Sequence, residues 1–123
     1  MADFPATSSD TAIAALLVPG TTYYLSQHTA DPGTTGANEV TGGSYARQPI
    51  TFGTASAGSE ASTDAQSFTS MPSVTGDLWS GLWSAVTGGT FLWGDPNSTV
   101  TGPVAAGATV DYAIGAIVAG PIS

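Results

Sequence analysis

Few side chains in this sequence are suited to acid–base or nucleophilic chemistry. The 123 residues include one His, one Arg and no Cys, which excludes a thiolate nucleophile and a disulfide framework. His28 and Asp31 could serve a serine in a catalytic triad. However, three residues along one segment is poor geometry for a triad, and no Gly-x-Ser-x-Gly motif is present. We therefore predict no catalytic residues and no enzymatic activity, with His28 ending a strand and hydrogen-bonded to its loop.

Two loops carry the oxygen ligands that calcium prefers. Asp31, Asn38 and Glu39 share the first loop, and Asp95 and Asn97 share the second. Neither loop has the twelve-residue ligand spacing of a dedicated calcium site. Asp and Asn are common in turns without any ion, because their side chains accept hydrogen bonds from the nearby backbone. We therefore expect no metal and no cofactor.

Arg47 is the sole basic side chain, apart from the His, in a chain of formal net charge −8. It needs a carboxylate, and Asp31 and Glu39 on the preceding loop, residues 30–43, are nearest in sequence. A guanidinium matches a carboxylate through two parallel hydrogen bonds. We predict an ion pair by which Arg47 anchors this loop to Asp31 or Glu39. A ligand-binding Arg47 is the weaker interpretation.

The charge balance excludes two classes of partner and favours a third. Nucleic acids and anionic membranes attract proteins through Lys and Arg, and this chain has one such residue against nine acids. Charged residues make up only 8% of the chain, against roughly 25% in ordinary soluble domains. Depletion of charge, and of Lys above all, is typical of surface that contacts protein. A monomer of unusual composition is the alternative.

Short elements must position these residues. We expect a helix over 12–18, capped by Ser8 or Ser9 and ended by Pro19-Gly20. After Gly20 the sequence favours strands separated by Gly and Pro. The expected strands cover residues 21–28, 45–52, 61–69, 78–86, 90–94 and 108–118, with Pro49 at a sheet edge.

The clearest hairpin holds all three tryptophans. Its strands flank Thr87-Gly88-Gly89, which is typical of a tight turn. Trp83 and Trp93 are expected to pack in the core as a cross-strand or diagonal pair. Alternation over 108–118 places Val110, Tyr112, Ile114, Ala116 and Val118 on one face. The predicted core and hairpin aromatics are Trp79, Trp83, Trp93 and Tyr112.

These patterns predict an all-β fold: an antiparallel β-sandwich, jelly-roll-like, with one short N-terminal helix. The length suits one domain. We expect residues 1–8 to form an N-terminal arm that orders on docking, and residues 9–123 to form a single β-sandwich domain.

Two segments resemble a known family. Residues 24–33 (YLSQHTADPG) followed by 38–48 (NEVTGGSYARQ) are similar to a signature of small tailed-phage and prophage proteins. Residues 81–83 (GLW) and 87–93 (TGGTFLW) also fit the hairpin of that family, so the resemblance covers roughly residues 22–118. Members are labelled tail fibre or minor tail proteins, and related small β-sandwiches serve as capsid decoration.

The resemblance implies a non-enzymatic structural component of a tailed-phage virion, assembled in the host cytoplasm. We expect a capsid decoration protein that binds and stabilises the shell. The alternative is a minor tail or tail-fibre protein that recognises the host surface. Either role implies major capsid or tail subunits as partners. The charge census independently predicts a homo-oligomer, for which we favour a trimer.

Overall fold

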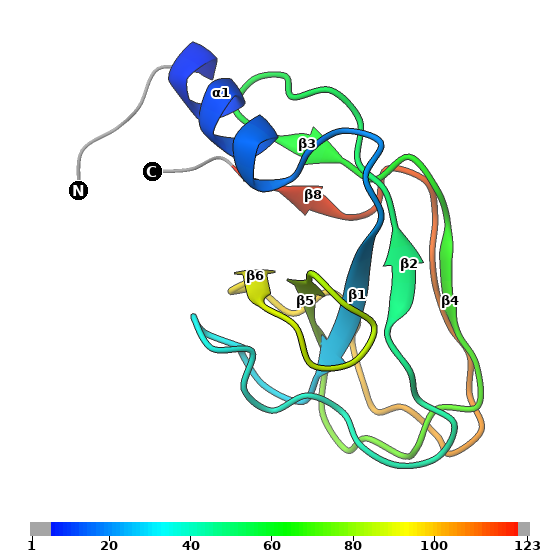
Figure 1. Cartoon of the computed structure of the whole chain (residues 1–123). Coiled ribbons are helices and arrows are strands. Elements are labelled where there is room, and N and C mark those ends of the chain that lie inside the picture. Colours follow the sequence, from blue (N-terminus) through cyan, green and yellow to red (C-terminus); the bar gives the residue numbers. More distant parts are fainter. Residues whose placement is uncertain (1–5, 121–123) are drawn as a thin grey trace. The chain divides into compact units, whose positions relative to one another are not determined.

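The structure, a computed structural model, describes residues 6–120. Over this range one helix is followed by eight strands (Figure 1). The elements are α1 (Ala6–Leu16), β1 (Tyr23–His28), β2 (Gln48–Ile50), β3 (Glu60–Ala61), β4 (Gln66–Phe68), β5 (Trp79–Trp83), β6 (Phe91–Gly94), β7 (Val110–Tyr112) and β8 (Val118–Ala119). No helix in this range is long and apolar enough to cross a bilayer.

The strands form one four-stranded sheet and two strand pairs. The larger sheet has the order β2-β1-β5-β6, and the pairs are β3-β8 and β4-β7. The β1-β5, β5-β6 and β3-β8 registers are antiparallel. This confirms the predicted class, an antiparallel all-β protein with one short N-terminal helix. The jelly-roll strand order stays a prediction. Pro49 lies in β2, an edge strand of its sheet, where a missing N–H is tolerated.

The chain clusters into two compact units. Unit 1 contains Met1–Thr22, Ile50–Ala65 and Tyr112–Ser123, and unit 2 contains Tyr23–Pro49 and Gln66–Asp111. Each has its own buried apolar side chains, including Ile13, Leu17, Phe52 and Ile117 in unit 1 and Leu25, Phe68, Leu78 and Leu82 in unit 2. The single domain expected over 9–123 stays a prediction.

The helix differs from its predicted bounds at both ends. It begins at Ala6, before the expected Ser8 or Ser9 cap, and ends at Leu16 rather than Val18. Ser9 lies inside the helix and is buried. Of the predicted arm, residues 1–5 lie outside the described residues, and Ala6–Ser8 are helical. Helix propensity does not explain the early start, since Ala6 is the only strong helix former among residues 6–11.

The last predicted strand is two strands, β7 and β8. The chain turns between them, with Gly115 at φ 80° and a hydrogen bond from Ala116 N–H to the Ala113 carbonyl. The turn breaks the alternation. Val110 and Tyr112 are buried as expected, but Ile114 is 69% exposed and Val118 is 45% exposed. The core positions after the turn are Ile117 and Ala119 instead.

The β5-β6 hairpin forms where the sequence predicted it, but β5 ends at Trp83 rather than Val86, so the connection covers residues 84–90 instead of only Thr87–Gly89. Gly88 and Gly89 have φ values of 61° and 75°, in the left-handed region that favours glycine. Ser84 N–H donates to the Thr90 carbonyl, and Thr90 N–H donates to Ser84 Oγ. A bulge between Leu82 and Trp83 then shifts the register. As a result Trp83 pairs with Phe91, and Trp93 pairs with Leu82.

Candidate functional site

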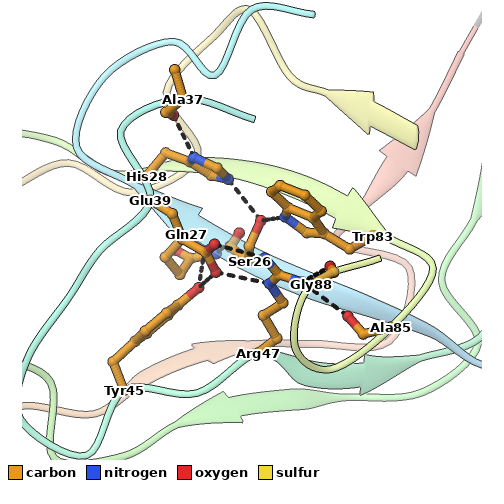
Figure 2. A network of polar contacts seen from close by, with 10 residues as sticks. All are labelled: Ser26, Gln27, His28, Ala37, Glu39, Tyr45, Arg47, Trp83, Ala85 and Gly88. Carbon is orange, nitrogen blue, oxygen red and sulfur yellow. Dashed lines mark hydrogen bonds and ion pairs between the residues drawn. The ribbon is translucent and has the colours of Figure 1, made fainter. Parts of the chain in front are cut away.

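Several polar side chains of unit 2 converge on one network, here called the Arg47 cluster (Figure 2). It joins strand β1, the loop that follows it, strand β5 and the turn after β5. Its members are Ser26, Gln27, His28, Ala37, Glu39, Tyr45, Arg47, Trp83, Ala85 and Gly88.

The Arg47 guanidinium contacts a carboxylate, two backbone carbonyls and an aromatic ring. Its Nε and Nη2 donate to the two carboxylate oxygens of Glu39, both at 2.9 Å. Its Nη1 donates to the carbonyls of Ala85, at 3.0 Å, and Gly88, at 2.8 Å. The guanidinium carbon lies 3.8 Å from the centre of the Trp83 ring, a cation–π distance. Arg47 thus fastens the 30–43 loop to the hairpin turn, and its side chain is only 9% exposed.

The Glu39 carboxylate accepts hydrogen bonds from both Arg47 and Tyr45. Tyr45 Oη donates to Glu39 Oε2 at 2.8 Å and accepts from Gln27 N–H at 3.0 Å. Burial alone would raise the pKa of Glu39, but the hydrogen bonds from Arg47 and Tyr45 and the Arg47 charge outweigh burial and lower that pKa. Burial, followed by the bond to Glu39, raises the pKa of Tyr45. Glu39 is therefore ionised and Tyr45 is neutral at physiological pH.

Ser26 and His28 form a hydroxyl–imidazole pair on one face of β1. Ser26 Oγ lies 2.7 Å from His28 Nε2, and His28 Nδ1 lies 2.7 Å from the Ala37 carbonyl. Because a carbonyl only accepts, Nδ1 carries the proton and Nε2 accepts from Ser26. Trp83 Nε1 donates to the same Ser26 oxygen at 2.9 Å. Burial lowers the pKa of His28, which keeps the ring neutral.

This pair has the connectivity of a nucleophile and its base, but no exposed surface. Ser26 and His28 are both 0% exposed. A Cβ at Gly36, in the covering loop, would lie 2.5 Å from the Trp83 ring, and one at Gly81 would lie 2.8 Å from His28 Nε2. No room remains for an acyl group beside the hydroxyl. The arrangement fixes β1, β5 and the loop to one another, as the sequence predicted for His28.

Asp31 takes no part in the network. It is exposed, and its Oδ1 accepts from Gly33 N–H at 2.8 Å. Asp95 accepts from Asn97 N–H in the same way. Both are Asx turns. Over residues 6–120, no three His, Cys, Asp or Glu side chains gather as metal ligands. Of the two carboxylates that the sequence offered to Arg47, the structure therefore places Glu39 beside it and Asp31 elsewhere.

The tryptophans depart from prediction. Trp79, Trp83 and Trp93 are half-buried, rather than in the core. Trp83 packs edge-to-face on Phe91, with ring centres 5.0 Å apart, instead of pairing with Trp93. The register before the bulge, in which Leu82 faces Trp93, already excludes Trp93 as the partner of Trp83, and the bulge after Leu82 then places Phe91 opposite Trp83. Tyr112 is buried, as expected.

An open cleft lies beside the Arg47 cluster, within unit 2. Its volume is about 420 Å³. The lining residues are Glu39, Val40, Thr41, Gly42, Tyr45, Ala46, Arg47, Val86, Thr87 and Gly88. It therefore presents a carboxylate, two threonines and the exposed side chain of Val86.

Sequence reasoning missed Ser26 and Trp83 as partners in one network. Spacing carried part of the signal, because Ser26 and His28 are two apart in a strand and so share a face. The sequence analysis also gave no sign that Glu60 is unusual. Glu60 is fully buried in β3, and neither of its carboxylate oxygens has a hydrogen-bond partner within the described residues.

Comparison with known proteins identifies the family. A protein-family model described as podophage GP4 fiber I protein gp80 matches residues 9–120. The chain belongs to this family. Membership supports a structural role in a phage virion, in association with other virion components. No curated protein and no solved structure matches the chain significantly.

Proposed function

We propose that this chain is a non-catalytic, repeated subunit of a phage fibre, held in place by contacts with neighbouring virion proteins. The observation that carries the proposal is its membership of the fibre family over residues 9–120. The Arg47 cluster supports it, because its charged and polar groups bind one another rather than point toward a reaction site. Such a network makes a small fold more rigid, which suits a structural subunit that must resist mechanical force.

The surface supports assembly. Over the described residues the large apolar side chains that stay exposed are Leu16, Val18, Val86, Ile114 and Val118. Charged residues make up only 8% of the chain, so association buries few charges. A specific interface takes roughly 800 Å² from each partner. We infer that copies associate with one another in a closed symmetric oligomer, for which we propose a trimer, or with other virion subunits.

The sequence alone favoured capsid decoration, whereas the description of the family favours the fibre. Immunogold labelling of purified particles separates these roles. Label on fibres is the expected result. Label spread evenly over the head would instead support the capsid decoration role. Deleting the gene adds an independent readout: intact heads with lost adsorption support the fibre, and unstable heads support decoration.

Host-glycan binding is a second candidate, and the cleft beside Arg47 favours it. Thr41, Thr87 and Glu39 offer hydrogen-bonding groups, and Val86 offers an apolar surface for a sugar ring. NMR titration with monosaccharides tests this directly. Binding predicts shifts of the Thr87 and Gly88 amides that Thr87→Val reduces. Shifts absent up to high sugar concentration would remove this candidate and leave the fibre role intact.

A further inference from the structure

Ordinary packing does not explain the buried position of Glu60 in unit 1. It lies in β3, opposite Ala119 of β8, and its exposed fraction is 0%. Within the described residues both of its carboxylate oxygens lack a hydrogen-bond partner. Buried carboxylates are normally paired or hydrogen-bonded, because an isolated buried charge is strongly unfavourable.

No side chain of this unit can neutralise Glu60. Unit 1 contains no Lys, Arg or His, since Arg47 and His28 both belong to unit 2. Arg47 is already bound to Glu39. The remaining way to remove the charge within the described residues is to add a proton.

Among the described residues, the elements packed around β3 bring further acids and no cation. β8 contributes only Val118 and Ala119, which do not titrate. From α1, Asp10 accepts the Gly58 N–H at 2.6 Å, and beyond β3 Asp64 accepts the Thr51 N–H at 3.1 Å. Both carboxylates thus have donors that Glu60 lacks.

We propose that Glu60 is a buried proton-binding site that couples the stability of unit 1 to pH. The proton is bound on folding, because the carboxyl is buried and the described residues offer it no donor. This inference is independent of the fibre role, since it rests on β3 alone. Burial raises the pKa of Glu60 from its ordinary value of 4.5.

The direction of the effect follows from proton linkage. Below pH 4.5 the carboxyl is protonated in both the folded and the unfolded chain, so it does not oppose folding. Above that pH the unfolded chain releases the proton first. Stability is therefore lost as pH rises from 4.5 toward the folded pKa, by up to about tenfold in the folding equilibrium constant per pH unit.

A carbon-detected NMR titration of the side-chain carboxyls in the full chain tests the site directly. We expect the midpoint of Glu60 to lie above 4.5. A midpoint at or below that value would overturn the proposal. This measurement needs no variant, so it decides the matter even if a substitution prevents folding.

Urea unfolding across pH 4 to 8 then tests the coupling to stability. Glu60→Gln keeps the shape and removes the titration, so it should lose the part of the stability decrease that wild type shows as pH rises. Asp111→Asn, an exposed acid of β7, is the matched control and should keep the wild-type dependence. Equal pH profiles for wild type and Glu60→Gln would refute the coupling.

Discussion

Arg47→Lys separates the charge of this residue from its geometry. Lysine keeps the positive charge but presents a single nitrogen, whereas Arg47 makes four hydrogen bonds through three nitrogens. From one position an ammonium reaches the Glu39 carboxylate or the hairpin carbonyls of Ala85 and Gly88, but not all of them. We therefore expect lysine to lose at least two of the bonds, and the stacking on Trp83 as well.

The magnitude follows from those contacts. Hydrogen bonds to charged groups contribute roughly 1.5 to 3 kcal/mol each. Glu39 is 22% exposed, so the lower value applies, and two lost bonds cost about 3 kcal/mol. Arg47→Ala leaves Glu39 without its cation and should cost about 3 to 5 kcal/mol. Lysine should therefore recover little of the loss caused by alanine.

Urea unfolding measures this difference. A loss of about 3 kcal/mol moves the midpoint by roughly 1 to 3 M, given the usual dependence on urea. Asp31→Asn is the control, because the structure keeps Asp31 away from Arg47, and it should change stability by less than about 0.5 kcal/mol. If Arg47→Lys left the urea midpoint within error of wild type, the paired hydrogen bonds of the guanidinium would not be what anchors the 30–43 loop.

Three further predictions test the surroundings of the cluster. Gly36→Ala should cost roughly 2 to 4 kcal/mol in thermal or urea unfolding, because φ is 74° and the new Cβ would meet the Trp83 ring. Trp83→Phe should cost at least about 1 kcal/mol in the same assay, because Ser26 loses the indole N–H donor; an unchanged midpoint would contradict that bond. The contribution of His28 to stability, opposite in sign to that of Glu60, should fall as pH falls below 6.5 because burial lowers the pKa of His28, and nitrogen NMR should find the neutral Nδ1–H ring persisting below that pH.

Much of the fold could be predicted because its signals are local. Gly88 and Gly89 marked the hairpin turn, and Pro49 marked an edge strand. The pairing of Arg47 with one carboxylate of the preceding loop was also within reach, because the chain has one such cation and the loop offered two acids. The choice between Asp31 and Glu39 was not, since an Asp carboxylate can accept from the backbone of its own turn or pair with an Arg.

The missed features depend on register and on contacts distant in sequence. The strand register pairs Trp93 with Leu82, and a bulge after Leu82 then pairs Trp83 with Phe91. The turn around Gly115 decides that Ile117 is buried and Ile114 is exposed. Nothing near Glu60 in the sequence indicates that its carboxyl is buried, because its burial depends on the fold of unit 1.

Salt dependence of assembly distinguishes the two kinds of partner that this charge pattern allows. Copies of a chain with net charge −8 repel one another, and salt screens that repulsion over about 10 Å at 0.1 M. Association between copies through the exposed apolar side chains should therefore strengthen as salt rises. Binding to a basic virion subunit should weaken instead, because salt screens the attraction. Sedimentation of the pure protein in 0.02 to roughly 0.5 M sodium chloride measures the first case. A protein that stays monomeric at every salt concentration would exclude self-association and leave a different virion protein as the partner that holds it.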